Sequence, residues 1–540
     1  MGINVRTRFD VCSPIPSSVV DSHAPPGIKQ AIITFGNYVI IFVAGTAYYK
    51  LNETLGWNNI TGFAMSITAP RYWTVLVPLA TTNYGRLAKD ATAIANDPIQ
   101  QVNVTTASGN VPGLLVQDGV NQPQFIYLDT NGNVQCRVTQ QYEQWNYDPT
   151  GANDSREYVP VGTYMEWFNG ILFIVDQQFN YIYRSVSGRP LDFMVNIDSS
   201  GDPGGRANTT SYSVGVGGIT AIRATPGNSL FVAAGGSSNY EITLDQSNVA
   251  VKIFGEWTFN RQFLFNANCV TDRGIIDVLG DTVFIASTGL RSFNAIKQQK
   301  NEGRNSVFSA NVQSLFNSIV QSSKINANSP DGWCSAINYD DYAIFSVNTT
   351  LGYVLVIYDT LNNCFVSLDV DQVGNHGVKQ FAAIATSNIA LYAITDDDRV
   401  VQLFADTANT DTATVRLAAM CNQNPEVELK VTSVRAILTN ITEDCEITCS
   451  LFVNNRFDQS ATTKLRYTPP IKTYTGASVG IDVGTQTNSV LFSFPNVAQG
   501  WKVFPVFSWT GGASLTSVSV ETSDYAPMQP LRTQSIISQT

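Results

Sequence analysis

The sequence predicts an all-β protein, with a β-propeller of six to eight blades followed by an antiparallel β-sandwich-like domain. The main observation is a repeat. About seven times between Tyr38 and Phe404, an apolar strand is followed by a Gly, Asn or Asp turn and a second strand rich in aromatic and β-branched residues. The usual spacing between copies is about 45 to 60 residues, which is close to the period of four-stranded blades, whereas a helical solenoid would repeat helices. The other two observations are a different strand pattern after residue 426 and only one segment with helical spacing.

The repeat also sets the size of the propeller. The copies begin at or near Tyr38, Gln124, Ile171, Leu230, Val283, Tyr342 and Ile389. Seven copies of about 53 residues fill roughly 370 residues, which fits the interval 31–425. The count is bounded between six and eight because residues 72–92 could form a further hairpin. A ring of radial sheets leaves only short edges, so a chain this rich in strands can avoid edge-to-edge aggregation.

After residue 426 apolar and polar residues alternate strongly. Residues 427–438 and 445–453 follow this pattern, and Pro469-Pro470 ends the next run. Further strands are expected at 489–494 and at 501–509, where Pro505 marks an edge or a bulge. We therefore predict a separate sandwich or platform domain at 426–525 and an extended tail at 526–540.

The first 30 residues contain Pro14, Pro16, Pro25 and Pro26 among few apolar residues. Proline fixes the backbone and removes a hydrogen-bond donor, so this composition predicts an extended arm at 1–30 without a regular strand or helix. The arm could pack along its own domain or reach a neighbouring subunit.

One segment has helical spacing. Residues 306–324 place apolar side chains three and four positions apart, and Ser306 is a suitable cap. We expect a short amphipathic helix near 306–324, as an insertion or as a crossover between blades. Packing within the protein is the favoured role, with a partner-binding helix as the alternative.

The composition favours a subunit of an assembly. Only 14% of the residues are charged, and the formal net charge is -11. Neutral amides and hydroxyls cost less to desolvate than ions, which suits large lateral contacts, although an ordinary secreted β protein has a similar composition. Sequence-specific nucleic-acid binding is not expected, because phosphate neutralisation by Lys and Arg supplies most of that affinity. The N-terminal residues lack the apolar run of a signal peptide, and no stretch approaches the length of a membrane span.

Residues that could carry chemistry are scarce. The two histidines are His23, in the proline-rich segment, and His376, in a Gly/Asn loop. Mechanisms that need a histidine base or several histidine ligands therefore have little to draw on. The eight cysteines are scattered without a CxxC motif, so free and mostly buried thiols are expected; they are Cys12, Cys136, Cys269, Cys334, Cys364, Cys421, Cys445 and Cys449. We predict no catalytic residue, no cofactor and no metal site.

Three short motifs match functional patterns only formally. Gly476 to Gly480 fits G-x-S-x-G, but the residues that follow do not begin a helix, as a nucleophile elbow requires. Gly215 to Gly218 precedes a strand-like run, whereas a phosphate loop precedes a helix. Asp396, Asp397 and Asp398 could bind a cation, but they lie where a hairpin needs turn residues.

Several phrases between residues 160 and 410 resemble the propeller of tail nozzle proteins from short-tailed bacteriophages, also called tail tubular or phage stabilisation proteins. These phrases are TrpPheAsnGlyIleLeuPheIleVal at 167–175, TyrIleTyrArgSerValSerGlyArgProLeuAspPhe at 181–193, GlyGlyIleThrAlaIleArg at 217–223 and GlyAspThrValPheIleAlaSerThrGlyLeuArgSerPhe at 280–293. The resemblance lies in strand phrases and their order, and it includes no catalytic fingerprint.

The resemblance implies a structural subunit of the phage tail, assembled in the host cytoplasm. Six copies would form a ring below the adaptor that joins the portal, bound to a tail fibre or tip protein. DNA would pass through the lumen without specific binding, and residues 427–540 are the candidate docking platform. The alternative is a carbohydrate- or receptor-binding propeller, perhaps one that cleaves glycans, in which Trp57, Trp73, Trp145 or Trp167 would stack on sugars. A third possibility is a scaffold propeller in a cellular complex.

Overall fold

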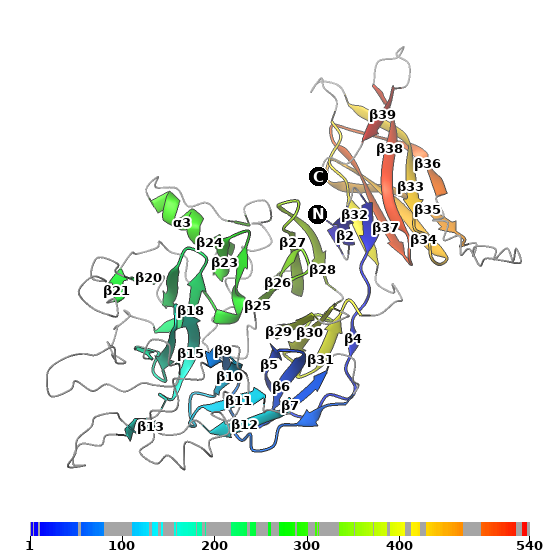
Figure 1. Cartoon of the computed structure of the whole chain (residues 1–540). Coiled ribbons are helices and arrows are strands. Elements are labelled where there is room, and N and C mark those ends of the chain that lie inside the picture. Colours follow the sequence, from blue (N-terminus) through cyan, green and yellow to red (C-terminus); the bar gives the residue numbers. More distant parts are fainter. Residues whose placement is uncertain are drawn as a thin grey trace, which may run out of the picture.

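The chain forms a ring of β-sheets with a second β domain attached to one side (Figure 1). The structure is a computed structural model, and it describes residues 2–3, 5–8, 11–51, 56–79, 111–128, 132–138, 142–143, 156–157, 159–179, 181–185, 190, 218–234, 238–244, 257–260, 269–286, 289–300, 308–309, 312, 334–349, 352–370, 372–385, 389–405, 412–421, 428–467, 488–524 and 532–536.

Seven antiparallel sheets follow one another along the chain as blades, which we number 1 to 7. Blade 1 contains β5 (Lys29–Phe35), β6 (Tyr38–Val43), β7 (Thr46–Leu51) and β8 (Asn58–Asn59); blade 2 contains β9 (Trp73–Leu79), β10 (Val111–Gln117), β11 (Gln124–Leu128) and β12 (Val134–Val138); blade 3 contains β15 (Gly162–Phe168), β16 (Ile171–Asp176) and β17 (Ile182–Arg184); blade 4 contains β18 (Ile219–Thr225), β19 (Ser229–Ala234), β20 (Ser238–Leu244) and β21 (Trp257–Asn260). Blade 5 contains β22 (Ile275–Val278), β23 (Asp281–Ala286) and β24 (Gly289–Ser292); blade 6 contains β25 (Ser335–Tyr339), β26 (Tyr342–Thr349), β27 (Gly352–Asp359) and β28 (Cys364–Asp369); blade 7 contains β29 (Val378–Ala385), β30 (Ile389–Thr395) and β31 (Val400–Leu403). The short strands β13 (Tyr142–Glu143) and β14 (Arg156–Glu157) pair between blades 2 and 3.

The blades close into a ring because a hydrophobic cluster fills each interface between neighbours. One cluster spans blades 2, 3 and 4. Others join blades 4 and 5, blades 5 and 6, and blades 6 and 7. The ring is completed where blade 7 packs on blade 1 and blade 1 packs on blade 2. The predicted β-propeller is therefore confirmed, and each of the seven sequence repeats falls in a different blade.

The N-terminal segment fastens this ring. Strand β4 (Val19–Val20) pairs with β31 and so supplies the fourth strand of blade 7. Directly after it, the Asp21 carboxylate accepts hydrogen bonds from Lys50 Nζ, at 2.6 Å, and from Trp57 Nε1, at 3.1 Å, both in blade 1. Burial raises the pKa of Asp21, but the bonds from Lys50, His23 and Trp57 outweigh it and hold that pKa below its usual value. The two ends of the propeller are thus joined by one short stretch of chain.

The same segment corrects one expectation. Residues 1–30, predicted to contain no regular strand, supply β1 (Gly2–Ile3), β2 (Val5–Arg8), β3 (Val11–Pro14) and β4. The prolines are compatible with these strands because Pro14 ends β3 and the others lie between strands, where no ladder hydrogen bond is needed. Of the two roles considered for the arm, the described residues pack along their own chain.

The C-terminal domain is a sandwich of two sheets around one core. The first sheet contains β1, β32 (Ala413–Arg416), β37 (Val503–Thr510), β34 (Cys445–Val453) and β35 (Arg456–Leu465); the second contains β2, β3, β38 (Ser514–Asp524), β33 (Leu429–Thr439) and β36 (Asn488–Gly500), with β39 (Arg532–Ile536) also paired to β38. Two segments cross the predicted boundaries: β32 lies before residue 426 and β39 lies in the tail predicted at 526–540.

Strand β1 connects the two domains. It pairs in parallel with β28 of blade 6 and antiparallel with β32 of the sandwich, so one nine-stranded sheet runs from blade 6 into the sandwich. An ion pair reinforces this junction, because Arg6 Nη2 lies 2.8 Å from Asp369 Oδ2, whose side chain is fully buried. The sandwich is therefore held to the propeller by a sheet, in addition to the chain that links them.

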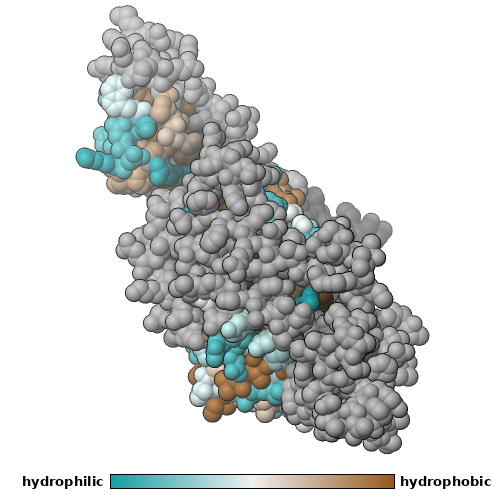
Figure 2. Space-filling model, turned by 90° about the vertical axis from the view of Figure 1, so that its left-hand side faces the viewer, coloured by the Kyte–Doolittle hydropathy of each residue, from teal (hydrophilic) through white to brown (hydrophobic). Residues whose placement is uncertain are grey.

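The helical elements among the described residues are short. Helix α3 (Phe293–Lys300) follows β24, and the 3-10 turn η2 (Asp272–Gly274) precedes β22. The helix predicted near 306–324 lies almost entirely outside the described residues, although Phe308 and Val312 pack against the cluster between blades 5 and 6. No helix in the described ranges is long and apolar enough to cross a membrane. On the face seen in Figure 2, hydrophobic and hydrophilic residues lie side by side in the coloured regions.

Candidate functional site

The innermost strands of all seven blades surround a cavity of about 540 Å³ on the propeller axis. Each blade contributes at least one side chain to its lining; examples in chain order are Ile33, Thr74, Glu166, Arg223, Asp277, Asn338 and Gln380. This cavity is the candidate functional site, because a concave surface with a few convergent polar groups is where ligands bind.

Arg273 forms the floor of the cavity. The 3-10 turn η2 places it just before β22, and its guanidinium crosses towards three other blades. Its Nη1 donates to the Lys379 carbonyl at 3.0 Å, and its Nη2 donates to the carbonyls of Gln30, at 3.1 Å, and Tyr72, at 2.9 Å. One side chain of blade 5 thus connects the starts of the inner strands of blades 7, 1 and 2.

A second arginine stands beside the floor. Arg71 Nη2 lies 2.5 Å and 2.7 Å from the two carboxylate oxygens of Asp272. The Arg71 Cζ atom also lies 5.1 Å from the centre of the Trp73 ring and 5.7 Å from that of Tyr164. Burial lowers the pKa of Arg273 well below its ordinary value; nearby Arg71 lowers it further, whereas Asp272 raises it. The floor and the side chain beside it therefore hold two guanidinium groups and one carboxylate.

Further along the axis the balance of charge reverses. Glu166 lies two residues beyond Tyr164 on β15, which places it about 7 Å farther along the strand. Its Oε2 is 3.8 Å from Arg223 Nη1. Burial raises the pKa of Glu166 to about 7, and Asp277 adds to the rise, while Arg223 and the Ala224 backbone oppose it. This upper level thus contains two carboxylates and one guanidinium.

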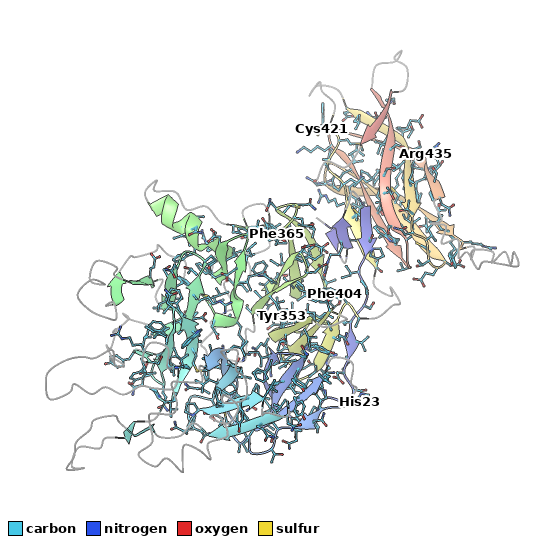
Figure 3. All side chains as sticks on the ribbon, in the orientation of Figure 1. His23, Tyr353, Phe365, Phe404, Cys421 and Arg435 are labelled. Carbon is cyan, nitrogen blue, oxygen red and sulfur yellow. The ribbon has the colours of Figure 1, made fainter. Side chains whose placement is uncertain are left out.

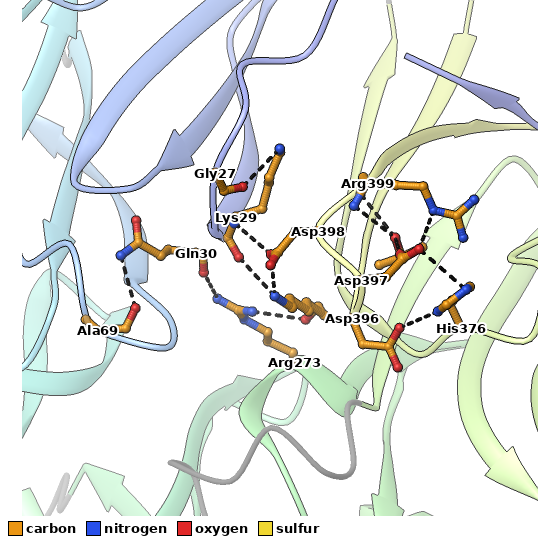
Figure 4. Close-up of polar contacts among 12 residues, drawn as sticks. Gly27, Lys29, Gln30, Ala69, Arg273, His376, Asp396, Asp397, Asp398 and Arg399 are labelled. Carbon is orange, nitrogen blue, oxygen red and sulfur yellow. Dashed lines mark hydrogen bonds and ion pairs between the residues drawn. The ribbon is translucent and has the colours of Figure 1, made fainter. Parts of the chain in front are cut away.

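The three aspartates singled out in the sequence form the turn between β30 and β31, as predicted (Figure 4). Each carboxylate contacts a basic side chain: Asp396 lies 2.8 Å from His376 Nδ1, Asp397 lies 2.5 Å from Arg399 Nε, and Asp398 lies 2.6 Å from Lys379 Nζ. Burial raises the pKa of Asp397, but hydrogen bonds from Thr395 and Arg399 outweigh it and leave that pKa lowered.

Among the described residues, the group that could hold a metal ion consists of two aspartates of this turn and the neighbouring His376. One ligand atom from each of His376, Asp396 and Asp397 lies within 4.8 Å of the others. However, Arg399 already neutralises Asp397, and a cation there would face its guanidinium. The arrangement therefore acts as a network of ion pairs that fixes the turn against blades 1 and 7.

The two histidines do not meet. His23 is exposed, beside Asp21 on the outer side of the propeller (Figure 3). His376 lies in the loop before β29 and contacts the aspartate turn (Figure 4). All eight cysteines are free, and burial raises the pKa of the Cys136 thiol to about 12 and that of the Cys445 thiol to about 11. Cys445 and Cys449 lie on one buried face of β34, whereas Cys421 is exposed in the sandwich domain.

The glycine motifs and tryptophans singled out in the sequence are only partly covered by the described residues. Gly218 is followed by strand β18, so a phosphate loop before a helix is not formed there. The motif at 476–480 and Trp145 lie outside the described residues. Trp73 and Trp167 line the axial cavity, while Trp57 packs near the closure of blades 1 and 7.

Sequence reasoning missed Arg71, Asp272, Arg273, Glu166 and Arg223 as a group. They come from separate blades, so no local spacing connects them, and each blade adds only one or two. The low content of charged residues could have indicated these side chains. Only 14% of the residues are charged, so a charged side chain at the end of an apolar strand needs an explanation.

Comparison with known proteins identifies no family for this chain. No family model matches the sequence, and no curated protein matches it. Among solved structures, the chain is similar to the β-propeller domain of Cps50 (Swd1) from Myceliophteria thermophila, with 10% identity, a TM-score of 0.29 and coverage of 72% of this chain and 100% of that one. It is also similar to YCF48 bound to D1 peptide, with 9% identity, a TM-score of 0.33 and coverage of 74% and 99%. The WD40 β-propeller domain of Doa1 matches with 7% identity, a TM-score of 0.32 and coverage of 73% and 98%. At these scores the propeller assignment rests on the sheet topology itself.

Proposed function

We propose that this chain is a non-enzymatic structural subunit of a virion tail, forming the homohexameric nozzle through which a short-tailed bacteriophage ejects its DNA. The family resemblance motivates the proposal, and its phrases at 167–175, 181–193, 217–223 and 280–293 begin or lie within blades 3, 4 and 5 in the order found in that family.

The observation that carries the proposal is the nine-stranded sheet through β1. A tail conduit must keep its shape under load, and a flexible linker between propeller and platform would let the two domains swing. A hydrogen-bonded sheet with a buried Arg6–Asp369 ion pair at the junction resists such motion. This construction suits a load-bearing subunit better than a freely hinged binding module.

The DNA path would lie between copies of the chain. The axial cavity of one propeller has only about 540 Å³ and its floor is crossed by Arg273. A double helix, whose major groove alone is about 12 Å wide, cannot pass through it. A lumen enclosed by six subunits of formal charge -11 would gain little from phosphate neutralisation, which favours passage without specific binding.

The proposed partners are an adaptor at one end of the ring and a fibre or tip protein at its side or far end. The sandwich is the candidate docking platform because it projects from one side of the propeller (Figure 1). Its position at the end of the nine-stranded sheet would transmit docking forces directly to blade 6.

Native mass spectrometry of the purified recombinant chain, together with mass spectrometry of purified particles, tests this proposal. The expected result is a hexamer in solution and about six copies per particle. A stable monomer that is missing from particles would contradict it.

A glycan-binding propeller is the second candidate, favoured by one specific observation. Trp167, Glu166 and Asp277 line the same axial cavity, and aromatic rings beside carboxylates are suited to sugars. A glycan array and a hydrolase assay test this candidate. Binding that is lost in Trp167→Ala and retained in Trp57→Ala would favour it over the nozzle, and an array without any hit would remove it.

A further inference from the structure

Two buried hydrogen-bond donors, one in the floor of the axial cavity and one beside it, have no partner among the described residues. They are Trp73 Nε1 and Arg71 Nε. Trp73 is only 5% exposed and lines the cavity, and Arg71 is 3% exposed and stacks over the Trp73 ring. A buried donor left without an acceptor is costly, so two of them side by side indicate that an acceptor belongs there.

The charges around these donors point to the type of acceptor. The two guanidinium groups are cationic side chains, and Asp272 is the carboxylate that pairs with Arg71. The guanidinium of Arg273 donates to backbone carbonyl oxygens, which carry no formal charge. The floor therefore has an excess of one positive charge in a buried position, within a chain whose net charge is -11. Buried charges are normally paired, so an anionic acceptor fits better than a neutral one.

The upper level limits the rest of such a ligand. Glu166 and Asp277 line the cavity there, and Arg223 is the cation beside Glu166, so one carboxylate is in excess once the pH exceeds about 7, the value to which burial raises the pKa of Glu166. Asp277 already accepts from Thr282, and Asn338 donates to the Asp277 carbonyl. A second anionic group would be repelled at this level, whereas hydroxyl or N–H donors would find acceptors.

We propose that the axial cavity binds a small oxyanion, with its negative group on the floor between Trp73, Arg71 and Arg273. The group can be an inorganic oxyanion or the carboxylate of a small hydroxylated molecule, because both present the same acceptor oxygens to the floor. A cavity of about 540 Å³ holds either one. This site does not depend on the proposed nozzle function, since it is contained within a single propeller.

Isothermal titration calorimetry on the full chain at constant ionic strength tests the site, with sulfate and gluconate as the two probes. We expect saturable binding of one ion per chain with a dissociation constant at or below about 1 mM for at least one probe. Sulfate alone would indicate an inorganic oxyanion, and tighter binding of gluconate would indicate a hydroxylated carboxylate.

Trp73→Phe is the decisive variant, because it removes the unpaired indole N–H and keeps an aromatic ring under Arg71. We expect it to weaken binding at least about tenfold, the usual effect of losing a hydrogen bond to a charged group. Trp57→Phe is the matched control, because its indole donates to Asp21 and lies outside the cavity lining. The control should bind like the parent chain.

Two results would overturn the proposal. One is the absence of heat and of thermal stabilisation with either probe, since a ligand bound only by the native state must raise the melting temperature. The other is equal affinity in Trp73→Phe and the parent. A variant with Arg71→Lys gives a second measure, because a point charge without the planar fork should also weaken binding while leaving Asp272 paired.

Discussion

The two domains bury their β-strands in different ways. In the propeller, both faces of a central strand pack against other blades, and all six residues of β16 and of β19 are buried. In the sandwich, one face of a strand meets the core and the other meets solvent, and burial along β34 alternates almost residue by residue. A blade strand therefore reads as an unbroken apolar run, whereas a sandwich strand reads as an alternation.

The two domains also differ in what holds each of them together. The propeller needs its ring to be closed, because each blade interface exists only while both neighbours are in place. Closure depends on the short strand β4 and on Asp21 between Lys50 and Trp57. The sandwich has one shared core, and it depends on the N-terminal strands β1 to β3 to complete its sheets.

Truncation of neighbouring residues should give the largest contrast between the domains. In β16, Phe173→Ala and Ile174→Ala should both be costly, by about 3–5 and 2–5 kcal/mol, because both side chains are fully buried. In β34, Ile447→Ala should cost about 2–5 kcal/mol, while its exposed neighbour Glu446→Ala should change stability by no more than about 0.5 kcal/mol.

Urea unfolding followed by circular dichroism measures these changes, with each transition compared with that of the parent chain. An alternating pattern in β16, with one of the two substitutions nearly neutral, would contradict burial on both faces. Equal costs at Ile447 and Glu446 would contradict the one-sided burial of the sandwich.

The junction between the domains should show the next largest effect. Arg6→Ala leaves the fully buried Asp369 carboxylate without its cation, and breaking a buried pair in this way costs about 3 kcal/mol. The exposed pair of Lys464 and Glu446 is the matched comparison, at 3.3 Å, and Lys464→Ala should cost less than about 1 kcal/mol.

Hydrogen exchange read out by mass spectrometry locates the effect of Arg6→Ala, which should appear in β1, β28 and β32. The double variant Arg6→Ala with Asp369→Asn should recover part of the loss, because the buried charge is then gone. No recovery, together with exchange that increases only within the sandwich, would show that the ion pair does not link the domains.

The strand pattern explains how much of the fold could be predicted from the sequence. Each mainly apolar run, such as 171–175 in blade 3 or 342–347 in blade 6, marks a strand covered on both sides. The repeat of these runs therefore predicted the positions of the blades. The strands of residues 1–30 were missed because β2 and β3 have only four residues each, and β1 and β4 have only two and are held by distant partners at Ser367 and Val401. Such short strands have no periodicity of their own, and tertiary pairing alone creates them.

The axial site was missed for a related physical reason. Arg273 matters because its guanidinium reaches carbonyls that follow it or precede it by more than 100 residues in sequence. Backbone carbonyls carry no sequence signature. By contrast, the position of Asp396 to Asp398 was predicted correctly because a turn between two strands is a local feature, whereas their ion pairs with His376, Arg399 and Lys379 were not predicted.

The smallest of the three effects concerns pH and contrasts the propeller axis with the sandwich surface. Burial raises the pKa of Glu166 to about 7 from an ordinary value of 4.5, so the folded chain binds one extra proton between these pH values. The contribution of Glu166 to the free energy of unfolding is fully present below about pH 4.5 and is lost as the pH rises to about 7, with an expected size of about 1–2 kcal/mol after allowance for partial exposure.

Glu166→Gln should therefore gain stability over the parent as the pH rises from 5 to about 8, measured by urea unfolding at each pH. Glu446→Gln, on the exposed face of β34, is the control against which the pH response of Glu166→Gln is compared. Parallel curves for Glu166→Gln and the parent would mean that the axial carboxylate is as well solvated as one on the sandwich surface, and the axial cavity would then lack the low-dielectric character that separates the two domains.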